Sequence, residues 1–293
     1  MTKETERPLG LRRLGPAAPG WLRALAFVDR VYGGFAIARD ELALSRLSAL
    51  QWTSLVVERY EAAASFYGGA NTAQGFAEDE RALIQRWLKA PPARVLVPAA
   101  GAGREAFALV AMGYQVSAFD PARPLFSEMG DTAARLGIDL PVQLATFSDF
   151  ADEALDRAVP GKLHRLLSLA PYDAVLLGLN SFSHLRTTEA RVRLLRACRA
   201  VCPQGPVLAT FYLEHVPMSR VRAAVRAIFG RLPGAQEVTP GDQLGLYGYE
   251  HAFSRTELET LAAAAGYEFS LLDAGFMPCG AFFPGPSSRE TRR

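Results

Sequence analysis

Cysteine is scarce in this sequence, and its scarcity excludes two classes of small stabilised fold. Three cysteines among 293 residues are too few for a disulfide framework and are typical of a protein kept in a reducing cytoplasm. Cys198 and Cys202 lie four residues apart in an expected helix. Two thiols without a second pair of ligands make a poor zinc site. We therefore expect no metal and interpret both cysteines as buried structural residues.

Long apolar runs and net charge are also missing. No apolar run approaches the ~18 residues that a membrane-spanning helix needs. The first ten residues, MTKETERPLG, are polar, so we expect no signal peptide. The formal net charge is +2 and charged residues make up 21% of the chain, which argues against nucleic acid or a membrane surface as a partner. We expect a soluble cytoplasmic protein, either a monomer or a homodimer.

A change of apolar periodicity near residue 90 divides the chain. Residues 1–20 contain three prolines and no period, which predicts a flexible arm. Apolar residues recur at helical spacing over residues 21–90, and this pattern predicts an N-terminal helical cap. Pro91 and Pro92 end the helical pattern. Beyond them, apolar runs of strand length alternate with helical segments.

The alternating segments predict an α/β fold. Strands that alternate with helices form a mostly parallel sheet with helices on both faces. The last two expected strands leave no room for a helix between them, so we expect them to pair antiparallel. The expected strands are 94–98, 115–119, 141–146, 172–179, 206–212, 267–273 and 276–283.

The stretch RVLVPAAGAGREAFALVAMGYQVSAFDP, residues 94–121, predicts a ligand site. A strand that enters a glycine-rich turn and then a helix places backbone N–H groups and the positive end of the helix beside a ligand. Gly101 and Gly103 supply the tight turn. Asp120 ends the next strand, where an acid about 20 residues beyond the turn accepts hydrogen bonds from ribose hydroxyls. We expect a nucleoside ligand here, and the alternative is a turn that only packs helix against strand.

The order of these elements resembles that of class I S-adenosylmethionine-dependent methyltransferases. VLVPAAGAGRE is similar to their first motif, SAFDP to their second-strand acid, YDAVLLGLNSFSHL to their fourth strand, and LLRACRAVCPQGPVLATFYLE to their fourth helix and fifth strand. The resemblance covers roughly residues 90 to 285. It implies a Rossmann-like, doubly wound, seven-stranded mostly parallel sheet whose last strand is antiparallel. It also implies S-adenosyl-L-methionine as the cofactor and a small-molecule acceptor, methylated at O or N rather than C.

The resemblance places the cofactor on the glycine turn. Gly101 and Gly103 match the last two glycines of the family pattern, and Ala99 replaces the first. Val97 stands where the family usually has an acid that orients the methionine end of the cofactor. Asp120 matches the ribose-binding acid.

Further cofactor contacts are implied after the third and fourth strands. Thr146 or Asp149 would serve the adenine amino group, with Phe147 against the ring, and Asn180 follows the fourth strand. Asp149 is equally consistent with a helix N-cap.

Histidines near the sheet rim are the candidates for a general base. A base is needed only when the acceptor is protonated at working pH, and ligands of open α/β sheets lie beyond the carboxyl ends of the strands. We expect His215 to be the base, then His251, with His184 third. The alternative for each is a hydrogen-bonding wall residue.

The expected catalytic domain, residues 91–293, contains a segment that is too long for a plain loop. Residues 216–250 combine an amphipathic helix with a Gly- and Tyr-rich stretch, and we expect a lid over the acceptor pocket or, alternatively, an insertion that packs at the sheet edge. Tyr60 and Tyr67 are candidate pocket aromatics, although core packing is the favoured interpretation for either one taken singly.

Two other functions use the same turn. An NAD(P)-dependent oxidoreductase is possible because Ala106, at the position of a third glycine, is tolerated in dinucleotide-binding turns. A non-catalytic nucleoside-binding protein with this fold would account for Val97 at the position of the usual acid.

Overall fold

The computed structural model describes residues 20–156, 161–214, 218–272 and 277–285. The chain divides into two compact units. The smaller unit is Met1–Leu47 with Val216–Pro240, and the larger unit is Ser48–His215 with Gly241–Arg293. The predicted flexible arm lies, up to residue 19, outside the described residues.

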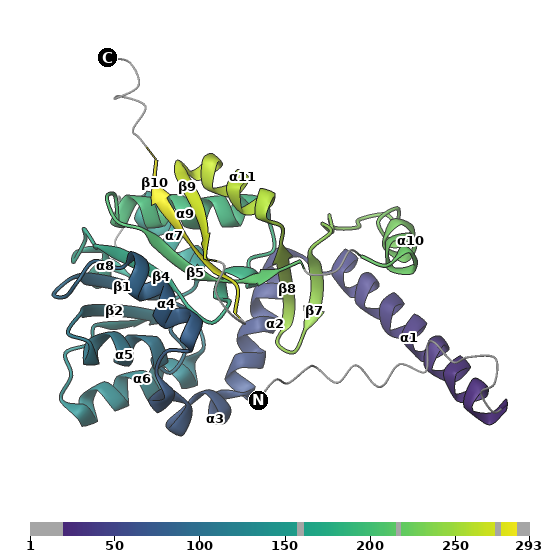
Figure 1. The fold of residues 1–293 in the computed structure, drawn as a ribbon, viewed down its shortest axis with the longest axis horizontal. Coiled ribbons are helices and arrows are strands. Elements are labelled where there is room, and N and C mark those ends of the chain that lie inside the picture. Colours follow the sequence, from purple (N-terminus) through teal and green to yellow (C-terminus); the bar gives the residue numbers. More distant parts are fainter. Residues whose placement is uncertain (1–19, 157–160, 215–217, 273–276, 286–293) are drawn as a thin grey trace, which may run out of the picture. The chain divides into compact units, whose positions relative to one another are not determined.

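The larger unit is built on a seven-stranded sheet with the order β3-β2-β1-β4-β5-β10-β9 (Figure 1). Its strands are β1 (Arg94–Pro98), β2 (Gln115–Asp120), β3 (Val142–Leu144), β4 (Ala174–Leu177), β5 (Val207–Thr210), β9 (Tyr267–Leu272) and β10 (Cys279–Pro284). Strands β1 to β5 pair in parallel, whereas β10 pairs antiparallel with both β5 and β9. The predicted doubly wound α/β sheet with an antiparallel last strand is confirmed.

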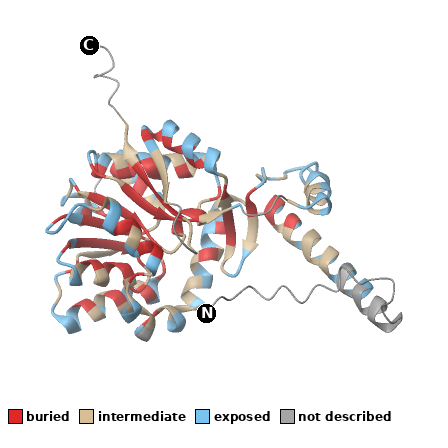
Figure 2. Cartoon of the chain, in the orientation of Figure 1, coloured by how far each residue is buried: buried red, intermediate tan, exposed pale blue. Residues whose placement is uncertain are grey.

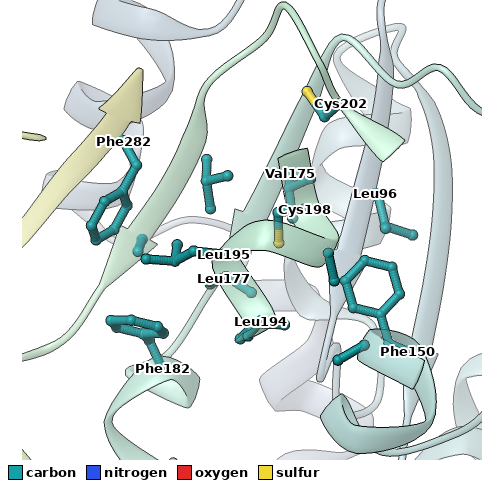
Figure 3. Close-up of a cluster of buried hydrophobic side chains, with 14 of the residues drawn as sticks. Leu96, Phe150, Val175, Leu177, Phe182, Leu194, Leu195, Cys198, Cys202 and Phe282 are labelled. Atoms are coloured by element: carbon teal, nitrogen blue, oxygen red, sulfur yellow. The ribbon is translucent and has the colours of Figure 1, made fainter. Parts of the chain in front are cut away.

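Helices cover both faces of this sheet, which explains why its strands read as continuous apolar runs. One face packs against α4 (Glu78–Trp87), α5 (Arg104–Ala111) and α6 (Arg123–Leu136), and the other against α7 (Phe147–Leu155), α9 (Thr188–Val201) and α11 (Arg255–Ala265). The buried side chains between the sheet and α4, α5 and α6 form a first hydrophobic cluster, and those between the sheet and α7, α9 and α11 form a second. Within β1, Val95 and Val97 belong to the first cluster and Leu96 to the second. Figure 2 shows the burial of the strands, and Figure 3 shows Leu96, Phe150 and Leu194 in the second cluster.

Several short elements complete the larger unit. They are α2 (Ala49–Ala62), α3 (Ala64–Tyr67), η2 (Gly69–Gln74), α8 (His164–Leu167) and η3 (Ser181–His184). The cysteines predicted to be structural, Cys198 and Cys202, are both buried, and burial raises the pKa of each thiol.

A small second sheet was not predicted. It contains β6 (Tyr212–Leu213), β7 (Asp242–Gly245) and β8 (Gly248–Phe253), in the order β6-β8-β7. Gly245 faces Gly248, so a two-residue turn of Leu246 and Tyr247 joins β7 to β8. Gly248 has a φ of +105°, which suits a glycine at the end of such a turn. The hairpin occupies the end of the segment predicted to be a lid.

The smaller unit contains helices α1 (Gly20–Arg46) and α10 (Arg220–Phe229). Glu41 on α1 is buried and accepts hydrogen bonds from Arg222 Nε at 2.5 Å and Arg226 Nε at 2.6 Å. Arg226 also donates to the carbonyl oxygen of Thr239 at 2.5 Å. These contacts hold the two helices together. In the described part of the chain, no helix combines the length and hydropathy that a membrane crossing requires.

The division into units bears on the expected domain boundaries. Of the expected helical cap, α2, α3, η2 and α4 share a unit with the sheet, and the segment 216–250 is divided at Gly241. The helical cap of residues 21–90 and the lid of residues 216–250 stay predictions.

Candidate functional site

A cavity of about 520 Å³, called the cleft below, opens in the larger unit at the carboxyl ends of the parallel strands. Each of these five strands contributes residues that follow its last position. The cleft is lined by Ala99 and Gly101 after β1, Asp120 and Pro121, which end and follow β2, Thr146 and Phe147 after β3, Gly178 to Ser181 after β4, and Tyr212 after β5. Open α/β sheets bind ligands at this rim, so the sheet topology and the cavity point to the same site.

The backbone of the cleft is strained in three places. Ala99, Leu179 and Asn180 have φ values of 52°, 46° and 59°, and in the described residues these are the non-glycine positions with positive φ. All three line the cleft. Such strain clusters at ligand sites because the backbone there must present its polar groups in a fixed direction.

Asp120 joins the end of β2 to the glycine turn. Its side chain is buried, and it accepts hydrogen bonds from the backbone N–H of Gly101 at 2.7 Å and of Ala122 at 2.8 Å. Burial raises the pKa of the carboxyl group to about 6, against the lowering effect of these two hydrogen bonds. Each carboxylate oxygen keeps a further lone pair that can accept a hydrogen bond from a ligand.

The two glycines of the turn have different surroundings. Gly101 lines the cleft with φ +59°, and a Cβ built on it would meet no atom within 4 Å. Gly103 is the N-cap of α5 with φ +92°, and a Cβ there would lie 2.8 Å from Phe107 and 2.9 Å from Met129. Gly101 therefore leaves open space for a ligand, whereas Gly103 packs the helix against its neighbours and is not among the lining residues.

The residues after β3 cap helix α7, and two of them also line the cleft. Thr146 is the N-cap of α7, and Asp149 completes a capping box by accepting hydrogen bonds from the Thr146 backbone at 2.9 Å and hydroxyl at 2.8 Å. Asp149 also pairs with Lys162 at 2.9 Å. Of the predicted adenine contacts, Thr146 and Phe147 line the cleft. Asp149 is part of the helix cap, as the third residue of α7.

The three ranked histidines lie in different surroundings. His215 lies outside the described residues. His251 is 1% exposed and is not among the residues that line the cleft. Its Nδ1 is 2.7 Å from Asp242 and its Nε2 is 2.9 Å from Glu257. His184, ranked third, does line the cleft.

His184 forms a hydrogen-bonded pair with Tyr60. The Tyr60 hydroxyl lies 3.0 Å from His184 Nε2, and His184 Nδ1 lies 2.9 Å from the carbonyl oxygen of Tyr249. Because a carbonyl oxygen only accepts, Nδ1 carries the proton. Burial lowers the pKa of His184 below its ordinary value, so the ring is neutral at pH 7 and its Nε2 accepts from the Tyr60 hydroxyl.

Aromatic side chains gather beside this pair. The rings of Tyr60 and Tyr247 stack with centroids 4.7 Å apart, and Tyr67 lies 5.3 Å from Tyr60 and 5.5 Å from Tyr247. All three line the cleft. Tyr60 and Tyr67 also pack against a buried cluster of Ala102, Ala122 and Leu125, so the structure gives both residues a pocket position together with the core packing that the sequence favoured. Tyr247 was not predicted at the site, because its position depends on the unpredicted hairpin of β7 and β8.

A charge cluster that was not predicted also lines the cleft. Arg104 donates to both carboxylate oxygens of Glu80 at 2.7 Å and to Glu105 at 2.6 Å. Burial raises the pKa of Glu105, and Arg104 opposes this effect. Arg104 and Glu105 directly follow the glycine turn in the sequence, which was the available signal for them.

Two polar atoms of the cleft wall lack partners. Asn180 Oδ1 and Ser181 Oγ are buried and form no hydrogen bond with the described residues. Both residues line the cleft beside Gly178. Buried polar atoms are normally satisfied, so an atom of a bound ligand or water is the natural partner for each.

The comparisons with known proteins concern the fold. No protein-family model and no curated protein matches the sequence. The solved 1,6-didemethyltoxoflavin-N1-methyltransferase of Burkholderia thailandensis, with its substrate and S-adenosylhomocysteine bound, has a TM-score of 0.55 and 16% identity, covering 82% of this chain and 92% of its own. The CcbJ methyltransferase of Streptomyces caelestis has a TM-score of 0.48 and 15% identity, covering 71% and 89%.

A Rhodobacter sphaeroides protein named for zinc-dependent alcohol dehydrogenases has a TM-score of 0.49 and 15% identity, covering 79% of this chain and 98% of its own. Of these three likenesses, the first has a score above 0.5 and bears on the fold. Together with the strand order, it shows that the chain has the class I methyltransferase fold.

Proposed function

We propose that the protein transfers the methyl group of S-adenosyl-L-methionine to a small-molecule acceptor. The observation that carries this proposal is the position of Asp120. This buried acid ends β2, is hydrogen-bonded to the turn at Gly101, and lines a cleft at the carboxyl rim of a methyltransferase-type sheet. A carboxylate in that place suits a ribose, whose paired hydroxyls are hydrogen-bond donors.

The donor set of the cleft fits the other parts of the cofactor. The open space beside Gly101 admits close approach of a ligand to the backbone. Thr146 and Phe147 offer a polar and an aromatic contact for adenine. Glu105 supplies an acid for the ammonium of the methionine part, in a chain whose usual motif acid is replaced by Val97. When bound, the cofactor supplies a methyl group activated on a sulfonium.

The remaining wall of the cleft suits the acceptor. Tyr60, Tyr67, Tyr212 and Tyr247 line it, with Val56 and Val57 beside them. Aromatic walls hold an apolar molecule by contact with its faces and exclude water. Positioning the nucleophile and excluding water are the contributions of this wall to the reaction.

The substitution Asp120→Asn tests the proposal. It keeps the size of the side chain and removes the charge that strengthens hydrogen bonds from ribose hydroxyls. We expect the dissociation constant of S-adenosylhomocysteine to rise about 10- to 100-fold, or about 1.5–3 kcal/mol. The measurement is calorimetric titration, with thermal melting to confirm folding.

Asp139→Asn is the matched control, because Asp139 is an exposed acid just before β3. We expect it to bind S-adenosylhomocysteine like the wild type. A folded Asp120→Asn variant with an unchanged dissociation constant would remove the residue on which the proposal rests.

A further inference from the structure

We propose that the acceptor is a hydroxyl group on a planar aromatic ring, and that Tyr60 takes the proton of this hydroxyl while passing its own proton to His184. This inference rests on the proposed methyl transfer and specifies its substrate class. Tyr60 would touch the substrate, so it is the catalytic residue, and His184 acts through it.

The direction of the hydrogen bond between Tyr60 and His184 is the first observation behind this inference. The backbone carbonyl of Tyr249 fixes the proton of His184 on Nδ1, which leaves Nε2 as an acceptor 3.0 Å from the Tyr60 hydroxyl. With its proton directed at His184, the Tyr60 oxygen keeps lone pairs free to accept a hydrogen bond. Tyr60 lines the cleft. A substrate hydroxyl there could donate to the Tyr60 oxygen, which itself donates to His184 Nε2.

Burial keeps both groups in the required protonation states. It raises the pKa of the Tyr60 phenol far above its ordinary value, and the neighbouring ionisable groups Tyr212, Tyr247, Glu250 and Asp120 act in the same direction. Tyr60 therefore stays protonated and cannot accept a proton without losing one. Burial also lowers the pKa of His184, so the imidazole is free to take that proton at neutral pH.

The walls around the pair select the kind of molecule that carries the hydroxyl. Tyr247 stacks on Tyr60 at 4.7 Å with an interplanar angle of 16°, and Phe66 and Tyr67 meet edge to face at 5.2 Å. Flat, apolar walls favour a planar ring.

The charges that line the cleft favour a neutral hydroxyl acceptor over a cationic amine. The acids that line the described part of the cleft are Glu105 and Asp120. Both are assigned to the cofactor in the proposed function, Glu105, which also pairs with Arg104, to its ammonium and Asp120, held by the glycine turn, to its ribose. Glu250, the other carboxyl group whose charge acts on Tyr60, is not among the lining residues, and burial raises its pKa to about 7. An ammonium beside Tyr60 and His184 would therefore have no carboxylate in the cleft wall to pair with, and burying an unpaired charge is costly.

The step balances without a further reactant. A lone pair of the acceptor oxygen forms the new C–O bond while the C–S bond of the sulfonium breaks, and the electrons of that bond stay on sulfur. The hydroxyl proton moves to the Tyr60 oxygen, and the Tyr60 proton moves to His184 Nε2. The resulting imidazolium keeps its Nδ1–H on the Tyr249 carbonyl, and later loses the extra proton to water.

Tyr60→Phe and His184→Gln test the proton transfer. With 2-naphthol and catechol as probes and isotopically labelled S-adenosylmethionine, we expect wild-type O-methylation and a fall in kcat of about 10²-fold or more in both variants. The dissociation constant of S-adenosylhomocysteine should hardly change. Exposed Tyr32 and His164 provide the matched controls Tyr32→Phe and His164→Gln, which should keep the wild-type rate.

Two readouts separate proton transfer from a structural role. The wild-type rate should fall as pH drops below the lowered pKa of His184, and His184→Gln should lose this dependence. The ¹⁵N spectrum of the resting protein should show His184 protonated at Nδ1.

Several outcomes would overturn the inference. They are variants that keep the wild-type rate and pH profile, a His184 protonated at Nε2, and methylation of 2-naphthylamine in place of 2-naphthol. A protein that binds S-adenosylhomocysteine but methylates neither hydroxyl probe would also reject this substrate class while leaving the proposed function standing. Failure to bind S-adenosylhomocysteine would instead reject the proposed function.

Discussion

His251 shows at the scale of one residue how hydrogen-bond partners decide a side chain's role. Both ring nitrogens face carboxylates, Asp242 at 2.7 Å and Glu257 at 2.9 Å. Asp242 also accepts from the Tyr249 hydroxyl, and Glu257 from fully buried Arg191. Burial lowers the pKa of His251, but the two carboxylates outweigh it and the net shift is upward. Below this raised pKa the ring is a buried imidazolium, which donates to Asp242 on β7 and to Glu257 on α11 and so joins both elements to β8.

The substitution His251→Gln should lower stability with a defined pH dependence. Because the pKa is raised in the folded state, the stabilisation is fully present below the unfolded pKa of ~6.5 and is lost as pH rises through the folded pKa. Removing one partner of a buried ion pair costs about 3–5 kcal/mol. We expect this loss in chemical denaturation at pH 6, a smaller one at pH 9, and unchanged S-adenosylhomocysteine binding.

His164→Gln, at an exposed histidine on α8, is the control and should leave stability unchanged. A His251→Gln variant of wild-type stability at pH 6 that fails in methyl transfer would return His251 to the role of a base.

At the scale of elements, the turn between β1 and α5 separates two uses of glycine. Gly101 and Gly137 both have positive φ, +59° and +65°, and an added Cβ would meet nothing within 4 Å at either. Gly137 is an exposed C-cap of α6, whereas Gly101 lines the cleft. The same backbone strain therefore occurs once at the proposed ligand site and once away from it.

Gly101→Ala and Gly137→Ala should be equally destabilised and differ in ligand binding. A left-handed alanine costs about 1–2 kcal/mol in each. We expect at least about a 10-fold loss of S-adenosylhomocysteine affinity, ~1.4 kcal/mol, for Gly101→Ala and none for Gly137→Ala, by calorimetry beside thermal melting. Equal affinities would mean that the open space at Gly101 is not used by the ligand.

The elements that the sequence predicted are those with local signals. β1 and β2 are continuous apolar runs bounded by proline, glycine or acid, and the antiparallel end of the sheet followed from a short connection. The hairpin of β7 and β8 escaped prediction because the polar His251 takes the position between Tyr249 and Phe253 on their shared face, next to the polar Glu250. These polar residues are buried in the fold, and only tertiary contacts supply the reason.

The site was predictable to a similar extent. Gly101 and Asp120 belong to a motif with fixed spacing, so both were placed in the cleft. The pairing of Tyr60 with His184 spans 124 residues, and no local pattern reports a contact of that kind. Glu105 was adjacent to the motif, yet its burial against Arg104 depends on Glu80 of another helix.

At the scale of the whole molecule, every residue that lines the cleft belongs to the larger unit. The smaller unit is stabilised by its own ion pairs, which the buried Glu41 forms with Arg222 and Arg226. We therefore expect ligand binding in the cleft to be independent of the smaller unit.

Glu41→Ala tests this independence. It leaves two arginines without their buried partner, a change that costs about 3–5 kcal/mol within the unit. We expect hydrogen exchange to accelerate in α1 and α10, with S-adenosylhomocysteine binding unchanged. Asp40→Ala, which removes the exposed neighbouring pair with Arg39, should leave exchange unaltered. Loss of ligand affinity in Glu41→Ala would show that the cleft requires the smaller unit.

The most direct test of the account is which nucleoside ligand the wild-type protein binds. The measurement is calorimetric titration of the full chain with S-adenosylhomocysteine and, separately, with NADH. We expect one site for S-adenosylhomocysteine, with a dissociation constant on the order of 1 μM, about −8 kcal/mol, and no heat of binding with NADH. Binding of NADH without S-adenosylhomocysteine would identify a dinucleotide site and contradict the account, and binding of neither would reject a nucleoside cofactor altogether.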